Sequence, residues 1–212
     1  MKKKKPARAD IKEQGKTYNR KILRNSVKRW AGKKGYKPSE AVHRKWFEWS
    51  NSDLKEKLEK QIEFMKKNNY RFSYTNYCEI DETSKERGIL ISGPEVITKK
   101  MMTAYCWPGC LTVMYDAEFL GLMQTADIRI NEEYALWIKI SQKTNCYLLN
   151  ENLAKYRRHK GSLTSKSYMK LVKWHYIMFR RAEDKTVVAS LFYTFGNLIF
   201  GTYKKLFYCK KY

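Results

Sequence analysis

Two adjacent carboxylates, Glu132 and Glu133, come directly before an apolar pattern with helical spacing and are the first candidates for acid–base chemistry. A carboxylate can take a proton from a hydroxyl group as that hydroxyl attacks a carbon atom. The same pair also suits a purely structural role, because acidic side chains at the start of a helix interact favourably with its dipole. The two residues alone do not decide between these interpretations.

A second candidate is the basic cluster Arg157-Arg158-His159, which follows an alternating run of residues. Arg157 and His159 are two positions apart, so on a strand or at its end they face the same side. A solvated basic surface is the alternative. The cysteines are odd in number and lack the paired spacing of a zinc site, so we interpret them as reduced, cytosolic and mostly structural: Cys78, Cys106, Cys110, Cys146 and Cys209.

The 212 residues suffice for one ordinary domain, and a hydrophobic content of 43% argues against disorder throughout. The formal net charge is +23, and residues 1–50 contain 17 Lys and Arg against 4 Asp and Glu. Such a charge favours an anionic partner, which could be nucleic acid, an anionic membrane surface or a phosphorylated substrate.

The elements that must position these residues begin near residue 53. Residues 1–50 have no clear periodicity and are expected to form loose helical turns or to be disordered. Farther on, the patterns predict helices at 53–67, 98–105, 132–144 and 165–183, and strands at 71–78, 88–91, 110–115, 146–149 and 152–156, the last two separated by a turn. Alternating strands and helices indicate an α/β domain.

Four segments resemble family 2 glycosyltransferases. Asn131–Lys139 resembles the family's acidic-acidic-Tyr-x-Leu-Trp-x-Lys/Arg segment, and Leu153–Thr164 resembles its Tyr-Arg-x-His-x-x-Ser segment. Lys57–Met65 is similar to the helix that follows the family's metal-binding loop, and Gly109–Asp116 resembles its acceptor-side strand. The order and spacing of all four, over about 160 residues, make the match specific, whereas any one alone would be weak.

The resemblance implies an incomplete GT-A fold (nucleotide-diphospho-sugar transferase, Rossmann-like) with C-terminal helices. It also implies an inverting enzyme that transfers a sugar from a nucleotide-sugar to a bacterial polysaccharide or a lipid-linked acceptor. Glu133 would be the catalytic base with Glu132 beside it, although the family more often has Asp at the position of Glu133. Trp137 is interpreted as core packing rather than as a sugar-stacking residue.

The resemblance further implies a donor site. Arg157 and His159 would bind the donor phosphates, and His159 could also help to hold a divalent cation, Mn or Mg. Asn51-Ser52-Asp53 keeps the shape of the family's metal loop with one carboxylate missing, so Asp53 is the remaining candidate ligand from that loop.

The N-terminal segment departs from the family, because residues 1–46 do not resemble its donor-binding half. A reading-frame change or a wrong start site would explain this, and a chain without that half is expected to be a remnant that lacks transferase activity. The predicted division is therefore a basic, poorly ordered segment at 1–50, a glycosyltransferase-like acceptor-side half at 51–164, and C-terminal helices at 165–212.

Residues 186–203 contain no charged side chain, and lysines follow them. Aromatic residues beside lysines favour a helix at an anionic lipid surface, with a covered core helix and a membrane span as alternatives. We therefore expect a cytoplasmic protein that associates peripherally with the membrane. The alternative function is a basic nucleic-acid-binding protein, which is disfavoured because no helix-turn-helix, zinc-finger or RNA-recognition signature is present.

Overall fold

The computed structural model describes residues 51–123, 128, 130–158 and 168–212, although not the side chains of residues 51–53 and 168. The chain divides into two units, Met1–Glu48 and Trp49–Tyr212, and the described residues belong to the second. The predicted properties of residues 1–50 and the predicted boundary at residue 164 lie outside the described residues. The predicted three-part division thus stays a prediction.

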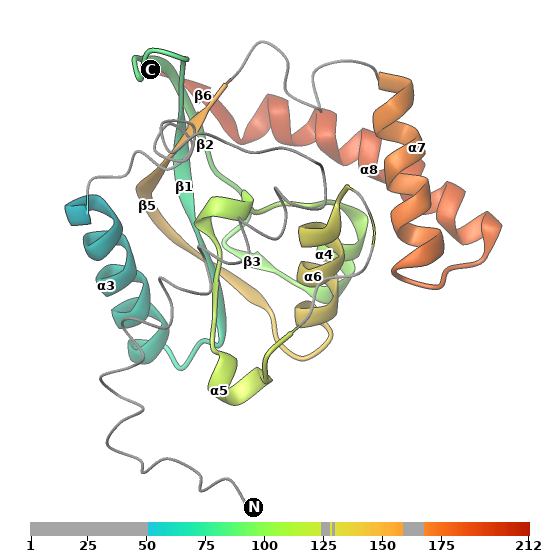
Figure 1. Ribbon diagram of the computed structural model, residues 1–212, viewed down its shortest axis with the longest axis horizontal. Helices are drawn as coiled ribbons and strands as arrows, with labels where there is room; N and C mark the ends of the chain where they lie inside the picture. The colour runs from blue at the N-terminus through green and yellow to red at the C-terminus, as the bar shows by residue number, and fades with distance from the viewer. Residues whose placement is uncertain (1–50, 124–127, 129, 159–167) are drawn as a thin grey trace, which may run out of the picture. The chain divides into compact units, whose positions relative to one another are not determined.

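A mixed sheet of six strands forms the centre of this unit (Figure 1), and it bears out the α/β prediction. Its main path has the order β3-β5-β1-β2-β6, with β4 pairing with β1. β1 and β5 are parallel, and the other pairs are antiparallel. The strands are β1 (Phe72–Ile80), β2 (Glu86–Ile91), β3 (Val96–Ile97), β4 (Met114–Tyr115), β5 (Cys146–Arg157) and β6 (Cys209–Lys211).

Helices cover both faces of β1. Phe72 and Tyr74 belong to the main hydrophobic core, which also contains residues of the helices α4 (Lys99–Ala104), α6 (Glu132–Ser141) and α7 (Tyr168–Arg181). Ser73 lies between them on the strand and accepts a hydrogen bond from Gln61 of the helix α3 (Asn51–Lys67) at 3.0 Å. Because successive side chains of a strand point to opposite faces, α3 covers the face opposite the main core.

The predicted helix at 53–67 is confirmed, and its end has a clear physical cause. Asn69 adopts a left-handed conformation with φ of 55°. Its amide donates to the carbonyl of Lys66, and the amide of Tyr70 donates to the carbonyl of Met65. These two bonds form the Schellman motif that terminates a helix. The buried face differs from the apolar pattern: Lys57 and Gln61 are buried with Met65, whereas the side chains of Leu54, Leu58 and Ile62 are partly exposed.

Two predicted strand boundaries are wrong. Residues 146–157 form one strand rather than two, because shifts in the β1–β5 register around Thr75 and Asn76 take up the irregularity that we predicted as a turn. The first half of the predicted strand at 110–115 is a short 3₁₀ helix, η1 (Cys110–Thr112), and only the two residues of β4 form a strand. The hydroxyl and the amide of Thr112 both bond to the carbonyl of Gly109, and these bonds close the turn.

The remaining helices are α5 (Ala117–Leu120) and α8 (Val187–Phe207). Thr98 caps α4 as predicted, with its side chain accepting a hydrogen bond from the amide of Met101. The helix predicted at 132–144 is present as α6 and ends at Ser141. Among the helices of the described residues, none combines the length and the apolar character that a bilayer-spanning segment needs.

Candidate functional site

One edge of the sheet gathers the elements that carry the predicted site residues. β1 and β5 are parallel and end at Ile80 and Arg157. α3 precedes β1 and α6 precedes β5, and each helix runs back along the sheet before its strand begins, so both helices start at the edge where the two strands finish (Figure 1). We call this the C-terminal edge. Ligands of open α/β sheets bind at the carboxyl ends of parallel strands, so this edge is the natural place for a site.

Glu132 and Glu133 form the first turn of α6 at this edge. Glu133 is exposed and Glu132 is half-buried, whereas the five residues that follow, 134–138, are all buried. The helix is therefore fixed by its apolar residues while its acidic first turn is presented at the surface. A carboxylate in this position is favoured by the helix dipole and accessible to a substrate.

Two cysteine side chains lie close to Glu133. Desolvation of the Cys110 thiol, followed by the negative charge of Glu133, raises the pKa of Cys110 to about 12. Burial likewise raises the pKa of Cys106 to about 12, with Lys204 acting in the opposite direction and Glu133 adding to the rise. Both thiols are thus neutral at physiological pH, and all five cysteines are free.

Gly109 allows the Cys110 segment to reach this position. A Cβ atom at residue 109 would lie 2.8 Å from an edge carbon of the Tyr77 ring, which is closer than side chains tolerate. The missing side chain lets the loop pack directly on Tyr77 of β1. Sequence reasoning did not identify Cys110 as a neighbour of Glu133, although the segment Gly109–Asp116 carried part of the resemblance.

Tyr134 anchors the first turn of α6 to the rest of the core. Its hydroxyl donates to the carbonyl of Thr103 at 2.9 Å and accepts a hydrogen bond from Nδ2 of Asn197 at 3.0 Å. Asn197 also donates to the carbonyl of Ala104 at 3.2 Å. The residue next to Glu133 is therefore tied to both α4 and α8, which limits movement of the carboxylate-bearing turn.

Trp137 packs in the core, as predicted. It is 7% exposed, and its ring centroid lies 6.0 Å from that of Phe72. The side chain cannot present a face to a sugar in this arrangement.

The structure places Arg157 against the β1–β2 turn. Its guanidinium donates to the carbonyls of Asp81 and Glu82, both at 3.0 Å, and to Oγ of Ser84 at 2.8 Å. Its neighbour Arg158 forms an ion pair with the buried Glu79 at 2.6 Å. A role for Arg157 on donor phosphates stays a prediction, and the contacts give this arginine a structural role as well.

The predicted metal ligands fall outside the part of the chain that can be described in detail. Asp53 lies in the first turn of α3, but its side chain is not among those described, and His159 lies outside the described residues. Within the described residues, no three His, Cys, Asp or Glu side chains gather as a metal site would require.

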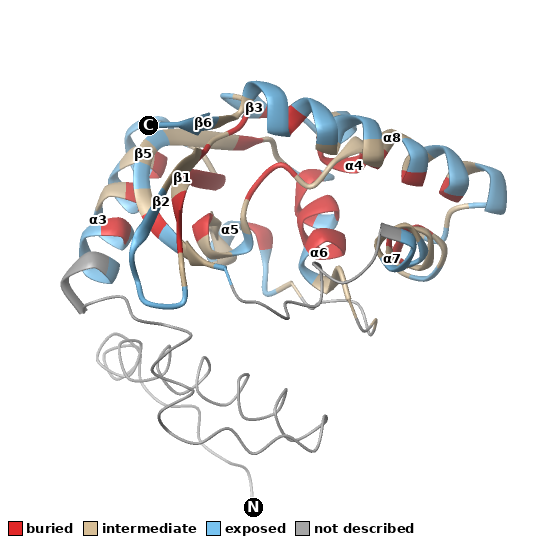
Figure 2. Cartoon of the chain, turned by 90° about the horizontal axis from the view of Figure 1, so that it is seen from above, coloured by how far each residue is buried: buried red, intermediate tan, exposed pale blue. Residues whose placement is uncertain are grey.

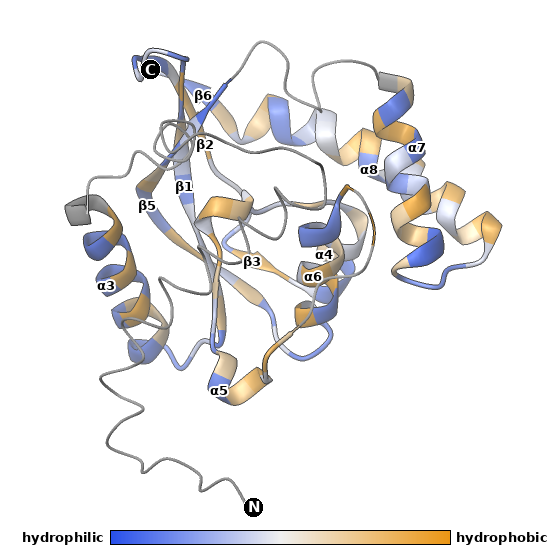
Figure 3. Ribbon diagram, viewed as in Figure 1, coloured by the Kyte–Doolittle hydropathy of each residue, from blue (hydrophilic) through white to orange (hydrophobic). Residues whose placement is uncertain are grey.

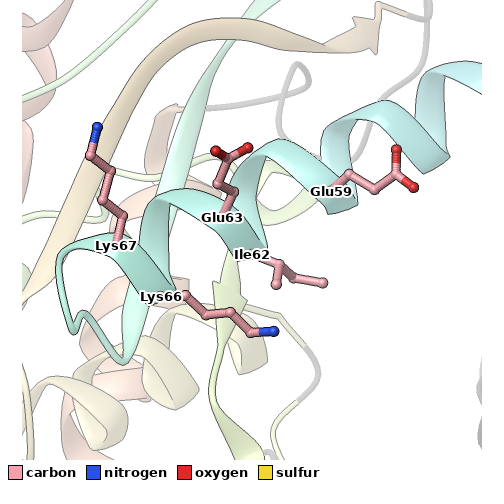
Figure 4. Close-up of a pocket in the computed structure, with 5 residues that line it drawn as sticks. All are labelled: Glu59, Ile62, Glu63, Lys66 and Lys67. Atoms are coloured by element: carbon pink, nitrogen blue, oxygen red, sulfur yellow. The ribbon is translucent and has the colours of Figure 1, made fainter.

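A shallow depression of about 440 Å³ lies on the outer side of α3 (Figure 4). Its lining comes entirely from that one helix: Glu59, Ile62, Glu63, Lys66 and Lys67. It does not include the residues around Glu133, and its open, single-helix wall offers little to hold a small molecule.

No protein-family model matches the chain. Over 130 residues it is 35% identical to the "Putative teichuronic acid biosynthesis glycosyltransferase TuaG" of Bacillus subtilis. This match covers 61% of this chain and 51% of that protein. Over 153 residues it is 30% identical to the "UDP-Glc:alpha-D-GlcNAc-diphosphoundecaprenol beta-1,3-glucosyltransferase WfgD" of Escherichia coli, covering 71% of this chain and 58% of that protein. Over 120 residues it is 34% identical to WfaP of Escherichia coli, whose name gives the same glucosyltransferase activity as that of WfgD. This match covers 55% of this chain and 46% of that protein.

The chain thus spans about half the length of these relatives. All three relatives are glycosyltransferases by name, and the mixed α/β sheet is consistent with such a fold. Sequence and structure together support similarity to the glycosyltransferases.

Proposed function

We propose that this chain carries the acceptor-side part of a family 2 glycosyltransferase of the GT-A type, which transfers a sugar with inversion from a nucleotide-sugar to a polysaccharide or lipid-linked acceptor. The observation that carries the proposal is the exposed carboxylate of Glu133, at the start of α6 and at the C-terminal edge of the sheet. The named activities of the relatives support the choice of reaction.

Glu133 is the base of the proposed reaction. Its carboxylate takes the proton of an acceptor hydroxyl while that oxygen forms a bond to the anomeric carbon of the donor sugar. The bond from the anomeric carbon to the nucleoside diphosphate breaks on the opposite side, and the diphosphate leaves with the electron pair. Glu132 adds a second negative charge beside the base, and the tie of Tyr134 to Thr103 and Asn197 holds the turn in place.

The donor side is proposed on the resemblance. Arg157 and His159 would contact the donor phosphates, and Asp53 and His159 would hold Mn or Mg, which would neutralise charge on the diphosphate. For Arg157, this requires that its bonds to the β1–β2 turn loosen. We also propose a cytoplasmic location at the membrane surface, because two relatives are named for a diphosphoundecaprenol-linked acceptor.

The test is transfer of labelled glucose from UDP-glucose to a synthetic GlcNAc-diphospholipid by the wild type and by Glu133→Gln. The variant should lower kcat by about a hundredfold to ten-thousandfold, because it removes a general base. Glu118→Gln is the matched control, since Glu118 is exposed in the first turn of α5. Both variants should unfold like the wild type, and a Glu133→Gln enzyme with normal turnover would remove Glu133 from the mechanism.

The alternative of a nucleic-acid-binding protein is not favoured by the relatives, all of which are named as glycosyltransferases. Its basis remains the net charge of +23. Salt-sensitive binding to random DNA without any response to nucleotide-sugars would favour it.

A further inference from the structure

In α8 all of the buried residues are polar, whereas most of the large apolar residues are exposed. The buried positions are Ser190, Thr194, Asn197 and Lys204, at 0–8% exposure. Their spacing of three, four and seven places them on one side of the helix. This is the reverse of the pattern that an ordinary surface helix of a globular protein shows.

Exposed apolar residues recur from the start to the end of α8, and Figures 2 and 3 show exposed and hydrophobic positions along the whole helix. Phe192 is 72% exposed and Phe195 is 65% exposed. We call this set the α8 stripe: Val187, Val188, Leu191, Phe192, Phe195, Ile199, Phe200, Tyr203, Leu206 and Phe207. A contiguous apolar surface of this extent marks an interaction site.

Specific hydrogen bonds prevent α8 from rotating to bury the stripe. Asn197 donates to the carbonyl of Ala104 and to the hydroxyl of Tyr134, and the amine of Lys204 donates to the carbonyl of Trp107. A rotated helix would leave these buried polar groups without partners, at a cost for each of them. The outward orientation of the stripe is therefore fixed by its polar side.

The charges around α8 identify the kind of partner. Residues 168–212 contain nine Lys and Arg against two Asp and Glu. Lys205 is exposed at the border of the α8 stripe, and Lys210 and Lys211 are exposed just beyond its end, close to Tyr203 and Tyr212 in sequence. Apolar side chains bordered by lysine and tyrosine match the composition of segments that lie in the headgroup region of an anionic bilayer.

We propose that the α8 stripe docks flat on an anionic lipid surface, with the apolar side chains inserted at the headgroup boundary and the lysines on the lipid phosphates. A second copy of this chain fits less well, because two faces bordered by the same lysines would bring like charges together. Docking itself does not depend on the proposed function. If Glu133 is the base, the link from Asn197 to Tyr134 would also fix the first turn of α6 relative to the bilayer and its lipid-linked acceptors.

The test is co-sedimentation of the full chain with vesicles of phosphatidylglycerol and phosphatidylcholine in equal parts, and with vesicles of phosphatidylcholine alone. The 17 basic residues of the segment 1–50 could bind anionic vesicles by themselves, so the deciding variant must leave the charge unchanged. Phe192→Ser combined with Phe195→Ser should reduce the partition onto the mixed vesicles at least about tenfold. Leu122→Ser is the control, because Leu122 lies outside α8 and is an apolar residue even more exposed, at 88%, than Phe192 and Phe195.

Neutralising the lysines tests the electrostatic part separately. Lys205→Gln, Lys210→Gln and Lys211→Gln should each weaken binding to the mixed vesicles about fivefold, and the loss should shrink at high salt. Unchanged binding of the double serine variant would overturn the proposal. It would also be overturned if the wild type did not bind the vesicles and formed dimers, while the double serine variant remained monomeric. The assay contains no donor or acceptor sugar, so its failure and that of the proposed transferase activity are distinguishable.

Discussion

At the scale of single residues, His175 is a buried titratable group with a predictable effect on stability. It is 8% exposed, and its ring lies edge-on to Tyr134, with the centroids 6.2 Å apart. Burial lowers the pKa of His175 from 6.5 to about 4. Because the folded state holds the ring neutral while the unfolded state takes up a proton below pH 6.5, His175 lowers the free energy of unfolding as the pH is lowered from 6.5 to 4.

We predict that His175 contributes a loss of about 3 kcal/mol across this window, from a pKa difference of about 2.5 units. His175→Phe removes the proton-binding group, so its unfolding free energy should change less steeply with pH. Denaturant unfolding between pH 4 and pH 7 measures this slope. Tyr176→Phe, on the same helix, is the control, and a His175→Phe protein with the wild-type slope would show that another group is responsible.

At the scale of elements, Asn197 joins three helices. Its side chain connects α8 to the last residue of α4 and to Tyr134 of α6. We predict that Asn197→Ala lowers the free energy of unfolding by about 1–3 kcal/mol, because it removes two hydrogen bonds from a buried position. Thr202→Ala is the matched control, since Thr202 is exposed on the same helix and bonds only to the carbonyl of Leu198.

Equilibrium unfolding in urea compares the two variants with the wild type. The Thr202→Ala protein should remain within about 0.5 kcal/mol of the wild type. Equal effects of the two changes would mean that the polar side of α8 is not what holds the helix, and the fixed orientation of the α8 stripe would lose its basis.

Whether most elements are helices or strands could be predicted from the sequence, but which face of a helix is buried was harder to predict. In α3, the apolar spacing of Leu58 and Ile62 correctly predicts a helix, yet Gln61 is fully buried because it donates to Ser73 and to the carbonyl of Thr112. In α8, the absence of charge from 186 to 203 correctly singled out the segment, while its inverted orientation depends on partners more than 60 residues away. Hydrogen bonds between residues so far apart in the chain leave no pattern in the sequence around either residue.

The same limit applies to the candidate site. The acidic pair was found because two adjacent carboxylates before a helix form a local pattern. Cys110 was missed, because the influence of Glu133 on its thiol depends on how a 3₁₀ turn packs against β1. The fixing of Arg157 by the β1–β2 turn was missed for a similar reason, since that turn lies over 70 residues earlier in the chain.

At the scale of the whole molecule, the C-terminal edge of the sheet is the candidate site for a nucleotide. The starts of α3 and α6 and the ends of β1 and β5 lie at this edge. The chain spans about half the length of the relatives it matches. The donor residues proposed from the resemblance, Asp53 and His159, lie outside the described side chains, so ligand binding is the direct way to examine them.

We predict that UDP together with manganese raises the thermal unfolding midpoint of the full chain. A ligand that binds only the folded state at a hundred times its dissociation constant stabilises it by about 2.7 kcal/mol, which for a chain of this size corresponds to roughly 5–10 °C. Neither UDP nor manganese alone should give the full shift, because the cation and the diphosphate bind together. Other nucleoside diphosphates with manganese establish which base is preferred, and His159→Ala should abolish the shift if the imidazole belongs to the donor site.

A cooperative transition that none of these mixtures moves would mean that the chain folds its acceptor-side elements without a donor site. Sugar transfer by this chain alone would then be ruled out, while the docking of α8 on lipid would remain as a separate property.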